Sequence, residues 1–492
     1  MSRYVLGIDQ STQGTKALLF DEEGGLLCRS DLPHTQIVDE RGWVEHDPEE
    51  IYRNTIQVVK NLVEKAGINK ADIAVLGISN QRETAACWEK ESGKPVYNAI
   101  VWQCARGAAI CEEIEKRGFA DKVKKYSGLQ LSPYFSAAKL AWIFRNVAGV
   151  KEKAEKGEIA CGTIDSFLVY RLTKGRDFRT DYSNASRTQL FNIRTLSWDK
   201  ELLDLFGIDE SCMAEVTDSD GDYGVTDFEG FLDKPIPIRG VLGDSHGALF
   251  GQGCLGRGMI KATYGTGSSI MMNIGEKPVF TDLGVVTSLA WSMGGKVNYV
   301  LEGNINYTGA VITWLKDEVG LISSAAESEE LARKAGKGDR TYLVPAFSGL
   351  GAPYWDSEAK AIICGITRTT GKAEIVKAAL DSIVYQITDI VRAMHQASGI
   401  EIGELRVDGG PTKNMYLMQF QSDMLGIPVR VPEAEELSGI GAAYAAGLSL
   451  GIYDEKIFDK MNRKSYKSEL DREQCEGLYA GWKEAVRMVM TN

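Results

Sequence analysis

The chain carries the same strand–turn–strand pattern twice, and this repeat constrains its fold most. Residues 4–20 form an apolar segment, a turn rich in Gly, Ser, Thr and Gln, and a second apolar segment, and residues 260–273 repeat the arrangement. Backbone N–H groups and small hydroxyls in such turns make a cradle for anions, and Gly allows a close approach. One copy would be weak evidence, because Gly- and Ser-rich turns join many hairpins. Two copies half a chain apart predict two similar domains that face one phosphate chain.

Strands and helices alternate after each hairpin, which favours an α/β architecture. With 492 residues the chain is too long for one ordinary core, and we expect domains at 1–250 and 251–492. A helix of small residues at 438–447 predicts close contact with another element, and the charged stretch 455–492 is expected to be a helical surface appendage. Helices are further predicted at 47–65, 305–317, 372–397 and from 415, and strands at 73–79 and 405–410.

The composition excludes several classes of protein. A net charge of −12 argues against a nucleic-acid or anionic-membrane partner, although local phosphate sites remain compatible with it. No apolar run approaches the ~20 residues that span a bilayer, and no signal peptide is visible. The nine cysteines are odd in number and contain no CxxC pair, which favours reduced thiols in a cytoplasmic protein. The four histidines do not cluster, so a zinc site is not expected.

Polar residues at the ends of apolar strands are the candidates for chemistry. Asp9 enters the first turn, where a carboxylate can hold a hydrated Mg²⁺ against phosphates or simply shape an Asx turn. Asp244 follows a short strand, where it can act as a general base or cap the next helix. Arg82 and Glu83 follow a buried strand and could bind a polyol, with Arg donating and Glu accepting, or form a solvated pair.

Other candidates carry a weaker signal by themselves. Trp102 and Tyr134 could line a sugar site, although a single aromatic residue more often belongs to the core. Gly410 and Asn414 follow a strand and could receive a nucleotide, although Gly-Gly is also a routine turn. No Walker sequence supports a P-loop alternative.

Taken together, the motifs resemble those of the FGGY family of carbohydrate kinases, and most closely its glycerol kinase branch. The resemblance covers nearly the whole chain. It is carried by residues 7–10, 79–84, 100–103, 133–142, 163–166, 184–188, 263–267, 345–356 and 407–410, and by the two family signatures at 134–146 and 361–381.

This resemblance implies two duplicated ribonuclease-H-like domains of the actin-like ATPase class, with a cleft between them. It implies ATP with Mg²⁺ as the phosphoryl donor, a small polyol or ketose as substrate, and a homo-oligomer. Asp244 matches the catalytic base and Asp9 the metal-associated carboxylate. The matching substrate positions are Arg82, Glu83, Trp102, Tyr134, Asp244 and Ser245, and the matching nucleotide positions are Thr12, Lys16, Gly265, Thr266, Gly267, Gly309, Thr313, Gly410 and Asn414.

The chain departs from the glycerol kinase pattern at three positions. Ser245 stands where Gln is usual, Ser269 where an aromatic residue is usual, and Cys104 where Asp is usual. Smaller side chains widen the expected pocket, so a pentulose kinase of the xylulokinase type is an alternative. Against it, xylulokinases commonly carry a Met-His pair at the positions where this chain has Arg82 and Glu83. An alternative from another class is an actin-like ATPase without a sugar substrate. The expected reaction is phosphoryl transfer from MgATP to a primary hydroxyl, with Asp244 accepting its proton.

Overall fold

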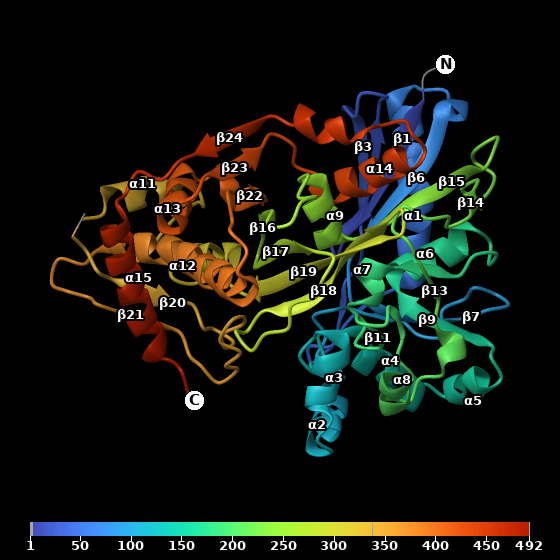
Figure 1. Cartoon of the computed structure of the whole chain (residues 1–492), viewed down its shortest axis with the longest axis horizontal. Helices are drawn as coiled ribbons and strands as arrows, with labels where there is room; N and C mark the ends of the chain where they lie inside the picture. Colours follow the sequence, from blue (N-terminus) through green and yellow to red (C-terminus); the bar gives the residue numbers. More distant parts are fainter. Residues whose placement is uncertain (1–2, 337, 492) are drawn as a thin grey trace.

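The protein folds into two lobes, each built on a mixed β-sheet with helices against it (Figure 1). The computed structural model describes residues 3–336 and 338–491. From edge to edge, the first sheet runs through β14 (Val225–Thr226), β15 (Ile236–Gly243), β6 (Ile73–Asn80), β1 (Tyr4–Gln10), β2 (Gly14–Phe20) and β3 (Leu26–Pro33). The second runs through β18 (Val286–Met293), β19 (Lys296–Ile305), β17 (Ser268–Gly275), β16 (Ile260–Tyr264), β22 (Leu405–Asp408), β23 (Val429–Pro432) and β24 (Arg463–Tyr466).

The two sheets share the topology of their central strands, and β18 is an additional edge strand of the second sheet. In the first, β1 pairs antiparallel with β2 and parallel with β6, which pairs parallel with β15. In the second, β16 pairs antiparallel with β17 and parallel with β22, which pairs parallel with β23. The central strands read as nearly continuous apolar runs because helices cover them, as parallel strands require. The repeat in the sequence is therefore a repeat in the fold, and the predicted duplicated α/β architecture is confirmed.

Smaller elements complete both lobes. A five-stranded sheet in the first half contains β4 (Ile37–Val38), β5 (Val44–His46), β8 (Ala99–Ile100), β7 (Ala85–Glu89) and β9 (Ile159–Thr163). Three two-stranded sheets pair β10 (Arg179–Asp181) with β13 (Glu215–Thr217), β11 (Phe191–Asn192) with β12 (Ser197–Trp198), and β20 (Tyr342–Val344) with β21 (Ile362–Cys364).

The helices fall in both halves of the chain. Those of the first half are α1 (Pro48–Ala66), α2 (Ala108–Lys116), α3 (Ala120–Ser127), α4 (Ser136–Asn146), α5 (Val150–Glu155), α6 (Ile164–Leu172), α7 (Tyr182–Ala185), α8 (Lys200–Phe206) and α9 (Asp244–Gly251). Those of the second are α10 (Gly309–Asp317), α11 (Glu327–Lys334), α12 (Lys372–Ser398), α13 (Met415–Leu425), α14 (Leu437–Ser449) and α15 (Arg472–Arg487).

Helix α14 comes late in the chain but packs against the first lobe, where it contacts β1, β6, β15 and α9 (Figure 1). Its small residues make this possible, as the sequence predicts. A Cβ on Gly441 would lie 1.9 Å from the carbonyl oxygen of Gly247 in α9, so the two helices meet backbone to backbone. A shared hydrophobic core joins the lobes here, with Leu18 and Leu249 from the first and Val300 from the second.

Two expectations about the second half need correction. The helix expected near 305–317 is present and ends at Asp317, but it begins only at Gly309, because β19 continues to Ile305. The stretch 455–492 is not a surface appendage within its described part. Its strand β24 pairs with β23 in the second sheet, and Trp482 of α15 is fully buried and packed in the core of the second lobe. The apolar residues that α15 buries lie on one face of the helix. They are outnumbered by its charged and polar residues, so the sequence of this segment resembles an exposed helix.

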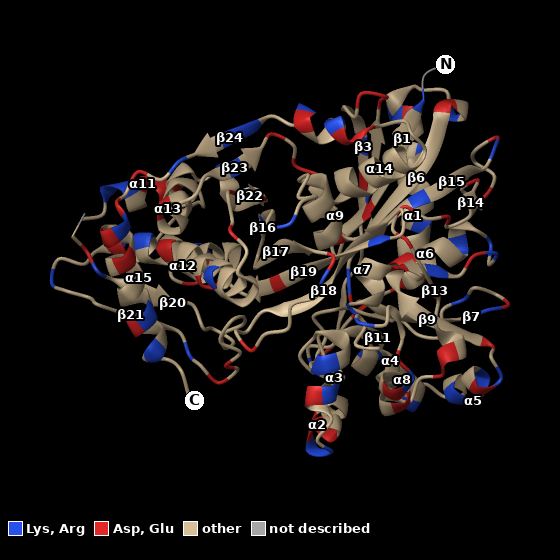
Figure 2. Ribbon diagram, viewed as in Figure 1, with Lys and Arg blue, Asp and Glu red and all other residues tan. Residues whose placement is uncertain are grey.

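Charged residues of both signs alternate on the outer helices and loops, and the central strands carry few of them (Figure 2). Across residues 3–336 and 338–491, no helix is long and apolar enough to cross a membrane.

Candidate functional site

A cavity of about 690 Å³ between the lobes gathers most of the predicted site residues. The first lobe contributes from the turn after β1, from the ends of β6 and β15, and from the loop before α4. The second contributes the turn between β16 and β17 and the end of β19. The predicted residues that line the cavity are Thr12, Arg82, Glu83, Trp102, Tyr134, Asp244, Ser245, Gly265, Thr266 and Gly267.

A second cavity, of about 670 Å³, lies within the second lobe and is lined by four further predicted nucleotide residues, Gly309, Thr313, Gly410 and Asn414. Its apolar part includes Leu380 and Leu417. The turn at 265–267 contributes to the first cavity and bonds to the helix that lines the second, because Gly309 N–H donates to the Gly265 carbonyl at 2.9 Å. The turn therefore links the walls of the two cavities.

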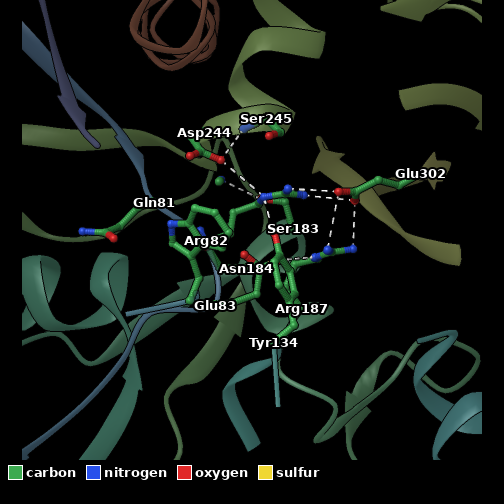
Figure 3. Close-up of polar contacts among 12 residues, drawn as sticks. Gln81, Arg82, Glu83, Tyr134, Ser183, Asn184, Arg187, Asp244, Ser245 and Glu302 are labelled. Atoms are coloured by element: carbon green, nitrogen blue, oxygen red, sulfur yellow. Dashed lines mark hydrogen bonds and ion pairs between the residues drawn. The ribbon is translucent and has the colours of Figure 1, made fainter. Parts of the chain in front are cut away.

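Asp244 is the first residue of α9, directly after β15. Gly243 takes the cap position without a side-chain cap bond, so Asp244 is not the helix cap of the alternative interpretation. Its side chain is one-third exposed, and its Oδ1 lies 3.3 Å from Arg82 Nε (Figure 3). A Cβ on Gly243 would lie 2.7 Å from Arg82 Cγ, so only Gly at this position lets Arg82 approach Asp244. The carboxylate is thus held at the cavity wall.

Arg82 and Glu83 are buried, in contrast to the solvated pair of the alternative interpretation; they are 4% and 2% exposed. Glu83 has a φ of 58°, an uncommon conformation that turns the chain sharply after β6. Glu83 Oε1 accepts a hydrogen bond from Arg187 Nε at 2.6 Å, and its carbonyl accepts one from Ser136. Such strain at a cavity wall is typical of functional sites.

An aromatic wall faces these charges. Trp102 and Tyr134 make an edge contact with ring centroids 5.5 Å apart, and Trp102 Nε1 donates to Thr12 Oγ1 at 2.9 Å. The fully buried Lys139 of α4 holds the loop that carries Tyr134, since its ammonium donates to the carbonyls of residues 133–135. The wall is therefore anchored to both the first turn and α4.

Asp9 and Lys16 lie opposite each other on β1 and β2, and Asp9 does not line the cavity. Lys16 Nζ lies 2.7 Å from Glu436 and 4.0 Å from Asp9, so the structure turns this predicted phosphate contact toward acidic partners, and it does not line the cavity. Asp9 is 6% exposed, and its Oδ1 has no hydrogen-bond partner among the described residues. Burial raises the pKa of Asp9 to about 6. A buried carboxylate with a free oxygen suits a hydrated divalent cation.

The sequence assigned no role to His246 or to Cys104. His246 is fully buried, and burial, followed by the charge of Arg82, holds its pKa well below the usual value. It is therefore neutral and unsuited to carry a proton. Cys104 is buried, and its Sγ accepts a hydrogen bond from Arg106 at 3.2 Å.

Sequence reasoning missed several polar residues of the site. Glu302 and Arg187 bind Arg82 and Glu83 (Figure 3), and Asn304 lines the cavity from the second lobe beside Ser269, which the sequence had singled out as a departure from the family pattern. One signal was available, because Glu302 interrupts the apolar run 299–303, and a charge inside a buried strand needs a partner.

Comparison with known families identifies both halves of the chain. The N-terminal domain of the FGGY family of carbohydrate kinases matches residues 4–251, and its C-terminal domain matches residues 260–450. Glycerol kinase 1 of Thermotoga maritima is 52% identical over 491 residues, which cover 99% of this chain and 100% of the relative. A glycerol kinase of Thermoanaerobacter sp. is 47% identical over 493 residues and covers 100% and 99%.

Solved structures agree on the fold. The crystal structure of Plasmodium falciparum glycerol kinase with ADP superposes with a TM-score of 0.94 at 34% identity, and it covers 100% of this chain and 99% of that one. A xylulose kinase of Lactobacillus acidophilus has a TM-score of 0.88 at 21% identity, with 99% and 97% covered, and shares the fold.

Proposed function

The chain belongs to the FGGY family of carbohydrate kinases and is an ATP-dependent kinase of small polyols or ketoses, and from this premise we propose that Asp244 is its catalytic base. The observation that carries the proposal is the meeting of Asp244, Arg82 and Glu83 in one cavity between the lobes. The family favours a kinase over an actin-like ATPase without a sugar substrate. We further propose that the domains 1–250 and 251–492 hold the polyol and the nucleotide, respectively.

In the proposed reaction, a primary hydroxyl of the substrate attacks the terminal phosphorus of ATP. The new O–P bond forms as the bond to the ADP oxygen breaks, and Asp244 takes the hydroxyl proton. Arg82 Nε, which faces Asp244, and the Glu83 carboxylate are suited to bind neighbouring hydroxyls. Trp102 and Tyr134 would cover the carbon chain, and water exclusion by the two lobes would limit ATP hydrolysis.

ATP is proposed to bind with its base and ribose in the second cavity and its phosphates at the turn 265–267. The four residues Gly309, Thr313, Gly410 and Asn414 support this placement. Asp9 would hold the hydrated Mg²⁺ of the nucleotide, because its Oδ1 is buried and has no hydrogen-bond partner in the described part of the chain. When bound, Mg²⁺ would neutralise charge on the phosphates.

Glycerol is the substrate that the Arg82–Glu83 anchor and the named relatives favour. One observation favours a second candidate, a four- or five-carbon polyol or ketose. Ser269 lines the cavity, and its buried Oγ has no hydrogen-bond partner within residues 3–336 and 338–491; Ser245 beside the base is also small. A longer substrate could give this hydroxyl a partner.

Coupled ADP production across glycerol, dihydroxyacetone, erythritol, xylulose and ribulose tests the substrate. We expect the highest kcat/KM with glycerol and measurable activity with erythritol. A pentulose that exceeds glycerol would support the pentulose kinase alternative, and equal ADP release with every compound and with none would contradict the kinase.

The base assignment is tested by Asp244→Asn. We expect kcat to fall by about 10²–10⁴ while the polyol still binds, since the amide keeps the shape but cannot take the proton. Tyr416→Phe, a change in the second lobe at a hydroxyl that bonds to Asp381, serves as a control with near-normal turnover. Near-normal turnover of Asp244→Asn would refute the assignment.

We also propose a cytoplasmic homo-oligomer. All nine cysteines are free thiols, which supports a reducing compartment. Four apolar side chains, Leu26, Leu27, Ile37 and Val38, are 40–57% exposed on the edge strands β3 and β4, which supports contact with another subunit. Light scattering coupled to gel filtration measures the assembly, and a monomer at micromolar concentration would contradict it.

A further inference from the structure

We infer that Glu302 of the second lobe, together with Arg187, is a positioning residue that fixes the polyol anchor Arg82 of the first lobe. The inference rests on the proposed function, since it assigns no new reaction and explains how the anchor is held. Its consequence is that the polyol site is complete only when the two lobes stand in the arrangement seen here.

Glu302 lies on β19, and its carboxylate contacts both arginines (Figure 3). Arg82 Nη1 donates to Oε2 and Nη2 donates to Oε1, each at 3.0 Å, which is a bidentate pair. Arg187 Nη1 lies 2.8 Å from Oε2, and Asn304 Nδ2 donates to Oε1 at 3.0 Å. One carboxylate therefore binds two cations that come from the other lobe.

All four charged side chains of this cluster are buried. Glu302 is fully buried, Arg187 is fully buried, and Arg82 and Glu83 are nearly so. Burial opposes the ionisation of Glu302, but Arg187 and Arg82 together hold its pKa well below the usual value. Glu302 is therefore ionised. Removing Glu302 or one of its two arginine partners would leave a buried charge without compensation.

The orientation of Arg82 follows from these contacts. Both of its terminal nitrogens are engaged by Glu302, so only Nε is directed at the first-lobe carboxylates, 3.3 Å from Asp244 and 3.9 Å from Glu83. Arg187 orients Glu83 in the same way, with its Nε at 2.6 Å from Oε1. Both halves of the proposed polyol anchor are consequently fixed by one network that includes a residue of the second lobe.

An ion cluster that served only to hold the lobes together would respond differently to mutation. Its loss would weaken the binding of ATP and of the polyol alike, because residues of the second lobe line both cavities. If Glu302 instead positions Arg82, its loss should weaken the binding of the polyol and leave the binding of ATP nearly unchanged. The ratio of the KM for polyol to the KM for ATP separates these roles.

The experiment uses the full-length enzyme with glycerol, or with the best substrate of the panel, and the variant Glu302→Gln. We expect the KM for polyol to rise at least about tenfold, the loss typical of a hydrogen bond to a charged group, while the KM for ATP changes less than about threefold. Polyol should also lose its ability to raise the Tm, whereas ATP should retain it.

Glu404→Gln is the matched control. Glu404 also bridges two arginines of the second lobe, Arg406 at 2.8 Å and Arg430 at 3.1 Å, but it lines neither cavity. Both KM values should stay at the wild-type level in this variant. If Glu302→Gln does not fold, Arg187→Lys carries the test, since Lys keeps the charge but cannot span Glu83 and Glu302 together.

The outcomes separate this inference from the proposed function. A wild-type enzyme that phosphorylates no polyol would defeat the proposed function. An active wild type whose Glu302 and Arg187 variants keep the polyol KM, or raise both KM values in parallel, would overturn the inference alone.

Discussion

Replacing Asp9 by Asn is predicted to stabilise the ligand-free protein at neutral pH and to weaken its kinase activity. Asp9 is 6% exposed, and its Oδ1 accepts no hydrogen bond among the described residues. Burial raises the pKa of Asp9 from 3.8 to about 6, so the folded protein holds this proton more tightly than the unfolded chain. A carboxylate kept at such a cost suits a role in binding rather than in stability.

The magnitude follows from the shift in pKa. Because the folded-state pKa is the higher one, the contribution of Asp9 to stability is fully present below pH 3.8 and is lost as the pH rises through about 6. At pH 7 a shift of roughly two units corresponds to about 3 kcal/mol of unfolding free energy. Asn carries no charge to bury, so Asp9→Asn should recover up to that amount, or roughly 6–12 °C in the Tm of a lobe of this size.

The assay compares the Tm of the wild type and of Asp9→Asn in EDTA, without nucleotide, from pH 4 to pH 8. The difference should be near zero at pH 4, grow between pH 4 and pH 6, and level off above pH 7. The variant should also lose about tenfold or more in kcat/KM for ATP, because the group that supports the cation is gone.

Asp356→Asn is the control with the opposite sign. Asp356 is also buried, but its carboxylate accepts hydrogen bonds from the backbone N–H and hydroxyl of Thr491 and from the backbone N–H groups of Glu358 and Ala359, which hold its pKa below the usual value. Its replacement should lower the Tm at neutral pH. The reasoning about Asp9 is refuted if Asp9→Asn is no more stable than the wild type at pH 8, or if its gain is the same at pH 4.

Three further predictions concern the pocket wall and the second lobe. Ser269→Phe should lower kcat/KM by about tenfold for erythritol and pentuloses but by less than about threefold for glycerol, because the ring fills space at the cavity wall. Equal losses for all substrates of the panel would contradict this prediction. Lys139→Met should raise the KM for polyol severalfold, because three carbonyls of the Tyr134 loop lose their donor; an unchanged KM would separate the loop from substrate binding. Trp482→Ala should lower the free energy of unfolding, measured in urea, by roughly 3–5 kcal/mol, because this fully buried side chain also donates a hydrogen bond to Asp389 at 2.7 Å. A loss below about 1 kcal/mol would mean that α15 is dispensable to the core.

Much of the fold could be predicted because it is local. The hairpins at β1–β2 and β16–β17 are visible as apolar runs around small-residue turns, and α12 is visible from its helical periodicity. The C-terminal segment could not be assigned correctly, because its apolar residues are few and their burial depends on a sheet formed by distant strands. The helix at α10 was placed too early because β19 and the helix share one apolar run.

The sequence by itself determined the repeated hairpin, the α/β class, and the residue types at strand ends that suit phosphoryl transfer. Motif and turn chemistry depend on neighbours in the chain, so they can be read without coordinates. Only the tertiary structure decided that Lys16 turns to Glu436 and that Glu302 meets Arg82, which is 220 positions away. Ion pairing and burial depend on distance in space, and no spacing in the sequence encodes which carboxylate of one lobe meets which cation of the other.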